Sequence, residues 1–292
     1  MIKQKILGTG LSGLVGSRIV ELLSDEFEFE DISRKTGTDI VNFQDVLARF
    51  KTSNAPFVLH LAAYTDVKGA EKEKELKEKS DAWMINVAGT QNIARACQET
   101  RKRIIYVSTD LVLGGDNMPK GGFKEDELPN PLSWYAVTKY EAEKEIEKIN
   151  SAWTIVRIAY PYRAIFEKTD FVRFFRDWLK SGKTISVLTD RLITPTFIDD
   201  LVNVFKILME KEATGVFHAV GNQAVSLYDA AVMIAENFNL DKALIKKTTR
   251  AEFLANRPPE PFSSTLSNAK IKQLGVQMHS FADGLKAIKE QL

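Results

Sequence analysis

Residues 2–23 read IKQKILGTGLSGLVGSRIVELL: a short apolar run, a loop with glycines at 10, 13 and 16, and then a stretch with helical periodicity. Because glycine lacks a Cβ, such a loop turns tightly and lets backbone N–H groups approach a pyrophosphate at the positive end of the following helix. A glycine pattern alone is weak evidence, but here it follows a strand and opens a helix, as the motif requires. The stretch predicts a dinucleotide-binding loop formed by Gly10, Leu11, Ser12, Gly13, Leu14, Val15 and Gly16.

The rest of the chain alternates two kinds of segment. Apolar runs typical of buried strands recur at residues 57–63, 103–108, 154–159 and 215–220. Stretches with helical periodicity lie at residues 14–23, 87–98, 134–149 and 197–209. This alternation predicts βαβ units, and therefore an α/β fold with a Rossmann-like, doubly wound parallel sheet. In such sheets ligands bind beyond the carboxyl ends of the strands.

Past residue 160 the alternation loosens. Residues 171–179, FVRFFRDWL, predict an amphipathic helix outside the βαβ series, and the tail from about residue 224 is mostly helical. We therefore expect two interleaved domains. Residues 1–160 plus about 190–222 form the NAD(P)-binding domain, and about 161–189 plus 223–292 form a smaller, mostly helical substrate-binding domain. The charged run AEKEKELKEK, residues 70–79, predicts a solvated helix or loop.

Composition narrows the class of partner. The 40 basic residues balance 39 acidic ones, so the chain has no electrostatic footprint for nucleic acid or an anionic membrane, and a small-molecule partner is expected. The single cysteine, Cys97, excludes an internal disulfide framework. No apolar run approaches the roughly 20 residues that span a bilayer, and the first strand starts too early for a signal peptide, which favours the cytoplasm. The three histidines lack metal-ligand spacing, so no metal site is predicted.

The second expected strand, residues 27–31, ends about 20 residues beyond the loop, where an acidic side chain binds the adenosine ribose of NAD. Asp31 is placed for this role. Ser33 and Arg34 follow at once, and a guanidinium there would hold the 2′-phosphate of NADP. The two interpretations compete, and a solvated basic turn is a third. We expect NADP or NAD, with NADPH preferred.

Tyr135 and Lys139, four residues apart near the start of a predicted helix, share a face. A lysine ammonium beside a phenol stabilises the phenolate, so we expect it, together with an oxidised nicotinamide, to lower the tyrosine pKa. The spacing alone means little, because Tyr64 and Tyr140 also have a lysine four residues later. Tyr135 differs because the strand before it, residues 103–107, delivers Ser108, Thr109 and Asp110 to the ligand edge, where a hydroxyl and the phenol converge.

At this point the sequence resembles a known family, the extended short-chain dehydrogenases. Residues 9–16 match its T-G-x-x-G-x-x-G loop, and residues 135–139 match its Y-x-x-x-K pair. Residues 60–63, HLAA, resemble its H-x-A-A strand end, and residues 86–90, NVAGT, resemble its N-V-x-G-T helix start. Within that superfamily the chain is most similar to the dTDP-4-dehydrorhamnose reductase family, on residues 62–67, 108–110, 195–201 and 257–259.

The resemblance implies a role for each matching position. Thr109 takes the hydroxyl role, Tyr135 donates the proton and Lys139 binds the ribose, while hydride passes from the nicotinamide to a 4-keto carbon of a nucleotide sugar. Further cofactor contacts are expected from Asp39, Ile40, Leu61, Ala62, Ala63, Asn86, Ser108 and Tyr160. Substrate contacts are expected from Thr65, Val67, Leu111 and Arg257. A homodimer is a possible assembly.

Departures from the family pattern lie around the expected sugar pocket. The family usually has V-D-x-A-E where residues 67–71 read VKGAE, and a tyrosine where this chain has Leu111. The natural sugar therefore stays open. An epimerase would use the same fold and the same pair, whereas a dehydratase usually carries T-D-E where residues 109–111 read TDL. A non-catalytic regulatory subunit, like the one of methionine adenosyltransferase, is a second class of alternative.

Overall fold

The computed structural model describes residues 3–114, 118–149, 152–254 and 264–292. Its centre is a six-stranded sheet in the order β10-β5-β4-β3-β1-β2, and every pairing in it is parallel. The strands are β1 (Gln4–Thr9), β2 (Phe27–Ile32), β3 (Phe57–His60), β4 (Arg103–Thr109), β5 (Trp153–Ile158) and β10 (Gly215–His218). The predicted doubly wound parallel sheet is confirmed.

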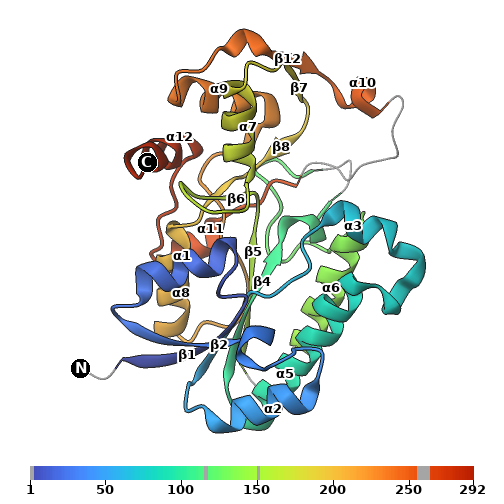
Figure 1. The fold of residues 1–292 in the computed structure, drawn as a ribbon, viewed down its shortest axis with the longest axis vertical. Helices are drawn as coiled ribbons and strands as arrows, with labels where there is room; N and C mark the ends of the chain where they lie inside the picture. Colours follow the sequence, from blue (N-terminus) through green and yellow to red (C-terminus); the bar gives the residue numbers. More distant parts are fainter. Residues whose placement is uncertain (1–2, 115–117, 150–151, 255–263) are drawn as a thin grey trace.

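Helices cover both faces of this sheet (Figure 1). On one face lie α1 (Leu14–Leu23), α8 (Asp200–Glu210) and the short α11 (Ala269–Gln273), which share one apolar cluster with the strands. On the other lie α2 (Phe43–Thr52), α5 (Gly89–Thr100) and α6 (Trp134–Glu147), which share a second cluster. Burying both faces explains why the strands are continuously apolar rather than alternating.

A second, mostly helical region packs beyond one end of the sheet, at the top of Figure 1. Its apolar cluster joins α7 (Phe171–Lys180), α9 (Leu227–Asn237) and α12 (Phe281–Glu290). Three small strand pairs accompany them: β6 (Pro161–Tyr162) with β9 (Thr196–Phe197), β7 (Ile185–Leu188) with β12 (Ile245–Thr248), and β8 (Leu192–Ile193) with β11 (Val225–Ser226). Because this region has an apolar cluster of its own, we propose that the chain forms two domains. Residues 271–278 pack against the sheet, so we assign them to the sheet domain as well.

The remaining elements connect these layers. They are η1 (Arg34–Thr36), α3 (Val67–Lys72), η2 (Lys74–Lys79), α4 (Asp81–Trp83), η3 (Met84–Ala88), η4 (Asp110–Val112), η5 (Lys242–Leu244) and α10 (Arg250–Leu254). The charged run is largely exposed, as expected, in α3 and η2. The helix predicted from residue 197 begins only at Asp200, because Phe197 belongs to strand β9 and pairs with Tyr162 of β6. Among the described residues, no helix is long and apolar enough to cross a membrane.

Candidate functional site

A cleft of about 830 Å³ opens at the carboxyl ends of the parallel strands. Its lining comes from the glycine loop, from the ends of β2, β3 and β4, from α6, and from residues 166–169 of the second region. This is the edge where the topology of a doubly wound sheet places a ligand. The cleft is therefore the candidate active site.

The glycine loop is held so tightly that two of its positions exclude a side chain. Gly10 has φ of +67°, and a Cβ on it would lie 2.6 Å from the backbone nitrogen of Ala62. A Cβ on Gly16 would lie 2.4 Å from the carbonyl oxygen of Gly10. Helix α1 begins directly after Gly13, and its first-turn N–H groups have no intrahelical acceptor. These lie at the cleft, so the loop fits a diphosphate.

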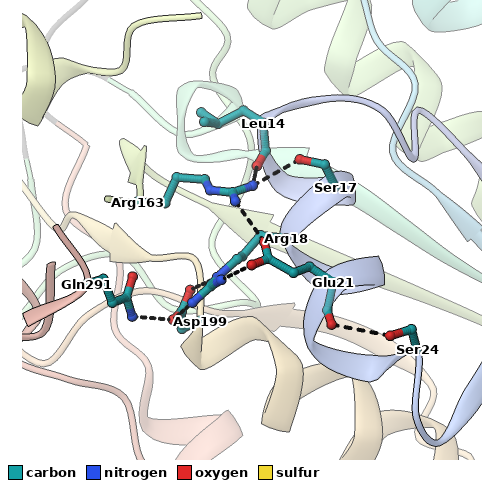
Figure 2. Close-up of polar contacts among 8 residues, drawn as sticks. All are labelled: Leu14, Ser17, Arg18, Glu21, Ser24, Arg163, Asp199 and Gln291. Carbon is teal, nitrogen blue, oxygen red and sulfur yellow. Dashed lines mark hydrogen bonds and ion pairs between the residues drawn. The ribbon is translucent and has the colours of Figure 1, made fainter. Parts of the chain in front are cut away.

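Helix α1 is also bound by Arg163, a residue that follows β6 in the second region. Figure 2 shows the guanidinium of Arg163 at the start of α1, where Nη1 donates to Ser17 Oγ at 2.9 Å and to the Leu14 carbonyl at 3.5 Å. Its Nη2 donates to Glu21 at 2.9 Å. Arg163 is buried and begins the segment whose residues 166–169 line the cleft. The loop's helix and the second region are thus tied together at the site.

A second arginine extends the same network. Arg18, also on α1, makes two hydrogen bonds to the carboxylate of Asp199, at 2.7 and 2.6 Å, and one to Glu21 at 2.6 Å (Figure 2). Gln291 near the end of the chain donates to the same Asp199 at 2.8 Å. Paired, charge-assisted bonds of this kind fix geometry as well as adding energy. They anchor α1 against α8 and the tail.

The end of β2 presents basic side chains to the cleft. Ser33, Arg34 and Lys35 are lining residues, and Arg34 pairs with Asp39 at 3.0 Å while its side chain stays 73% exposed. Asp31 is not among the lining residues; its carboxylate accepts a hydrogen bond from Ser33 Oγ at 2.6 Å. This edge therefore offers positive charge rather than a free carboxylate.

The end of β3 is fixed by buried polar contacts. His60 bridges Thr9, at 2.6 Å, and Thr90, at 2.9 Å. Burial, and next the charge of Lys139, lower the pKa of His60 to about 3, so its imidazole is neutral. It is a structural histidine that ties β1 to α5. The residues after it, from Leu61 to Ala63, line the cleft.

Asn86 lies in the π-helix η3 and supports the active-site helix. Its Oδ1 accepts from the Tyr64 N–H at 2.8 Å, and its Nδ2 donates to Thr138 Oγ1 at 2.9 Å. Thr138 stands on α6 between the expected catalytic tyrosine and lysine. Asn86 is not a lining residue, so we expect it to act through α6 rather than by touching the cofactor.

Thr109, Tyr135 and Lys139 converge on the floor of the cleft. Thr109 is the last residue of β4, and like Tyr135 it is buried and lines the cleft. The same Thr109 Oγ1 donates to Asp110 Oδ1 at 3.0 Å. Lys139 Nζ donates to the Val107 carbonyl at 2.9 Å. The arrangement puts a phenol, a hydroxyl and an ammonium at one wall, as acid–base chemistry on a carbonyl requires.

Burial dominates the electrostatics of this group. Burial, followed by the charge of Asp110, raises the pKa of Tyr135 above its usual value, and the nearby Thr109 hydroxyl opposes the shift. Burial lowers the pKa of Lys139 to about 7, against the pull of the nearby Glu143 carboxylate. The chain's own groups therefore raise the phenol pKa, because desolvation of the phenolate is the largest effect. The lowering expected from Lys139 together with an oxidised nicotinamide stays a prediction.

Comparison with known proteins places the chain in a family. A family model described as the RmlD substrate binding domain matches residues 4–292. The chain belongs to this family. The resemblance to dTDP-4-dehydrorhamnose reductases that the sequence motifs indicated is thereby confirmed.

Two relatives match along almost the whole chain, and a third matches part of it. The dTDP-4-dehydrorhamnose reductase of Aggregatibacter actinomycetemcomitans is 28% identical, over 98% of this chain and 98% of its own. The crystal structure of dTDP-4-dehydrorhamnose reductase from Bacillus anthracis strain Ames in complex with NADP matches with TM-score 0.89 and 27% identity, covering 100% of both chains. Methionine adenosyltransferase 2 subunit beta of Bos taurus is 28% identical over 70% of this chain and 62% of its own.

Most of the predicted site residues of this family member line the cleft. They are Gly10, Ser12, Gly13, Leu14, Val15, Gly16, Ser33, Arg34, Asp39, Ile40, Leu61, Ala62, Ala63, Thr65, Ser108, Thr109, Tyr135, Lys139 and Tyr160. Of the others, Leu11 is buried beneath Gly8, and Val67 and Leu111 pack in the small cluster around Tyr135. Arg257 lies outside the described residues.

Some lining residues were not predicted. Lys35, Thr38, Val41, Ile85, Val107, Asp110, Ile158, Pro161 and residues 166–169 also face the cleft. Two of them had a local signal in the sequence: Lys35 belongs to the same basic turn as Arg34, and Asp110 directly follows Thr109. Residues 166–169 have no such local signal, because tertiary packing of the second region brings them to the loop.

Proposed function

We propose that this chain is an NAD(P)H-dependent oxidoreductase, a reductase of a nucleotide-activated 4-keto-6-deoxy sugar of the dTDP-4-dehydrorhamnose type. The observation that carries the proposal is that one cleft holds both the phosphate loop and the Thr109, Tyr135 and Lys139 group. Full-length similarity to reductases of that name supports it, including the one determined with NADP. A reductase needs a hydride source and a proton source side by side, and the cleft provides a place for each.

We propose NADPH as the preferred cofactor. The first turn of α1 would bind the diphosphate, and Arg34 with Lys35 would bind the 2′-phosphate. Asp31, the residue placed to bind a free ribose hydroxyl, has its carboxylate engaged by Ser33 instead. When bound, the dihydronicotinamide supplies the hydride.

The chain's own residues supply the proton and hold the sugar. Tyr135 is proposed as the proton donor to the keto oxygen, because its phenol is buried at the cleft and remains protonated at neutral pH. Lys139, fixed by the Val107 carbonyl, is proposed to bind the ribose. Thr65 lines the cleft and stays a predicted substrate contact.

The test is oxidation of NADPH or NADH with a panel of dTDP-, UDP- and GDP-linked 4-keto-6-deoxy sugars. Tyr135→Phe should lower kcat about 100-fold or more, because a positioned general acid contributes on that scale. The matched control is Tyr140→Phe on the same helix, where the tyrosine also has a lysine four residues later but packs in another cluster. Equal turnover by Tyr135→Phe and wild type would contradict the assignment.

The same assay separates the alternatives. A sugar epimerised without net cofactor oxidation would favour an epimerase. Tight cofactor binding without turnover of any sugar would favour the non-catalytic regulatory subunit considered from the sequence. Methionine adenosyltransferase 2 subunit beta is among the relatives.

We also propose a homodimer in the cytoplasm that binds no nucleic acid. The near balance of 40 basic and 39 acidic residues supports the last point, since nucleic-acid binding depends on a basic patch. Light scattering on the purified chain tests the dimer, and a filter-binding assay with duplex and single-stranded DNA tests the other point.

A further inference from the structure

Arg163 is a buried cation that stands outside the cleft. The residue is 8% exposed, directly follows β6, and is not among the lining residues. The two arms of its guanidinium contact different turns of helix α1: Nη1 donates to Ser17 Oγ and to the Leu14 carbonyl, and Nη2 donates to Glu21 (Figure 2). Because Leu14 lines the cleft, the first arm connects Arg163 to the site through the helix.

The two arms differ in what they contribute. The side chain of Glu21 is 54% exposed, so water screens its ion pair with Arg163, and such pairs contribute little to stability. The bond to Ser17 Oγ is 2.9 Å long and comes from a buried, charged donor, and charge-assisted hydrogen bonds are the stronger kind. Arg163 therefore holds chiefly the first turn of α1.

This first turn has few restraints of its own. Gly13, at its N-cap, has no side chain that could accept a bond from the N–H groups of the turn. Gly16, inside the turn, destabilises a helix relative to alanine. A set of donors that has to be ordered when the ligand arrives binds more weakly than one already in place. A restraint from outside the loop therefore strengthens anion binding.

Arg163 is itself fixed by the segment that carries it. Its backbone N–H donates to Asp170 Oδ2 at 3.3 Å, and the same oxygen accepts from Arg173 Nε at 2.9 Å. Arg173 Nη2 also donates to the Lys168 carbonyl at 2.6 Å. Asp170 and Arg173 are both buried, and residues 166–169 of this segment line the cleft. Arg163 thus reaches α1 from a hydrogen-bonded segment that also forms a wall of the site.

We propose that Arg163 is a positioning residue for the cofactor, which keeps the first turn of α1 in the conformation that binds the diphosphate. The proposal rests on the cofactor binding in the function proposed above. NADPH and NADH carry the same diphosphate, so loss of Arg163 weakens the binding of both by the same factor. This distinguishes Arg163 from Arg34, which we expect to bind the 2′-phosphate that only NADPH carries.

The first experiment is a fluorescence titration of Arg163→Met with NADPH and with NADH. Methionine keeps an unbranched apolar stem and removes every donor. Both Kd values should rise about tenfold, which corresponds to about 1.4 kcal/mol. In the sugar assay the KM for NADPH should rise by a similar factor while kcat at saturating NADPH changes less than about twofold, because the bound cofactor orders the turn. Unchanged Kd values, or a rise for NADPH alone, would overturn the proposal.

The matched control is Arg18→Met, the same substitution in the same network. The Arg18 guanidinium bonds Asp199 and Glu21, and neither partner belongs to the first turn. This variant should lower the midpoint of urea unfolding but change both Kd values less than about twofold. If both methionine variants weaken cofactor binding equally, affinity follows overall stability and the proposal fails.

A second variant, Ser17→Ala, removes the acceptor instead of the donor. Ser17 is not a lining residue, so this change takes no contact away from the cofactor. Its Kd for NADPH should lie between those of the wild type and Arg163→Met. The double variant should bind no more weakly than Arg163→Met, because both changes remove the same bond, and additive effects would refute the contact. If Arg163→Met does not fold, wild-type affinity in Ser17→Ala contradicts the proposal.

The last experiment needs no cofactor, so failure of this proposal and failure of the proposed function are distinguishable. The amide of Ser17, which bonds the Gly13 carbonyl at 3.0 Å, should exchange its hydrogen about tenfold faster in Arg163→Met, as followed by NMR. The amide of Ser24, which bonds the Val20 carbonyl at the other end of α1, should keep its wild-type rate. Equal acceleration at both ends would indicate a general loss of stability and count against the proposal. If the wild type binds neither NADPH nor NADH, the proposed cofactor fails, while the exchange rates still decide whether Arg163 holds the turn.

Discussion

Replacing Asp110 by asparagine should make the folded protein more stable near neutral pH. Burial raises the pKa of this carboxyl from 3.8 to about 6. Near neutral pH the folded protein therefore contains a buried carboxylate whose ionisation costs more free energy than it does in the unfolded chain. A shift of about two pKa units corresponds to about 3 kcal/mol in the free energy of unfolding. Asparagine removes this cost. Its carbonyl oxygen can accept from one of the two hydroxyls, Thr109 or Ser264, and its NH2 group can donate to the other, because a hydroxyl can also accept.

The sign follows from proton counting. Between pH 3.8 and about 6 the folded state binds more protons at Asp110 than the unfolded state does. The free energy of unfolding of the wild type therefore falls as the pH rises through this window, and the variant lacks that fall. The stabilisation by Asp110→Asn should thus approach about 3 kcal/mol at about pH 8 and shrink towards zero at about pH 4.

Urea unfolding at the two pH values measures this difference. Asp110→Leu is a contrast, because it removes the charge but leaves the hydroxyls of Thr109 and Ser264 without their acceptor, at a cost of about 1 to 3 kcal/mol for each unsatisfied group. If the gap in stability between wild type and Asp110→Asn is the same at both pH values, the reasoning from the buried charge is refuted.

Three further predictions concern the loop, the cofactor and the core. Gly16→Ala should abolish NADPH binding in a fluorescence titration, because its Cβ would lie 2.4 Å from the Gly10 carbonyl; undiminished binding would show that the loop yields. Arg34→Ala should raise the Kd for NADPH about tenfold and leave the Kd for NADH unchanged, because only NADPH carries the 2′-phosphate that the lost guanidinium binds. Glu143→Gln should cost about 3 to 5 kcal/mol in urea unfolding, because it leaves the buried Arg157 guanidinium without its 2.7 Å ion pair; a cost near zero would mean that the pair relaxes into solvent.

The sequence predicted those parts of the site whose signals are local. The glycines, the apolar strands and the tyrosine–lysine spacing each reflect a requirement of a few consecutive residues, and helix α1 spans Leu14–Leu23 as its periodicity indicated. The strand edge then brought Thr109 to Tyr135 through topology alone.

What the sequence could not predict depends on distant partners. The Asp110 carboxyl accepts a hydrogen bond from Ser264, 154 residues further along the chain, and the phenol pKa responds to burial and to the charge of that same Asp110. The π-helix around Asn86 has no proline or glycine within its five residues to announce it. Strands β7 and β12 are each four residues long and pair across some 60 positions of the chain, which local pattern cannot anticipate.

The contacts of Arg163 restrict how this enzyme can be recombined. The residue belongs to the segment that we assign to the sugar, yet its side chain binds Leu14, Ser17 and Glu21 of the cofactor helix. In a chimera that takes its substrate-binding domain from a relative, Arg163 would be replaced while its acceptors on α1 stayed in place. Changing the sugar preference by exchanging domains will therefore require that the contacting residues of α1 be exchanged together with the substrate-binding domain.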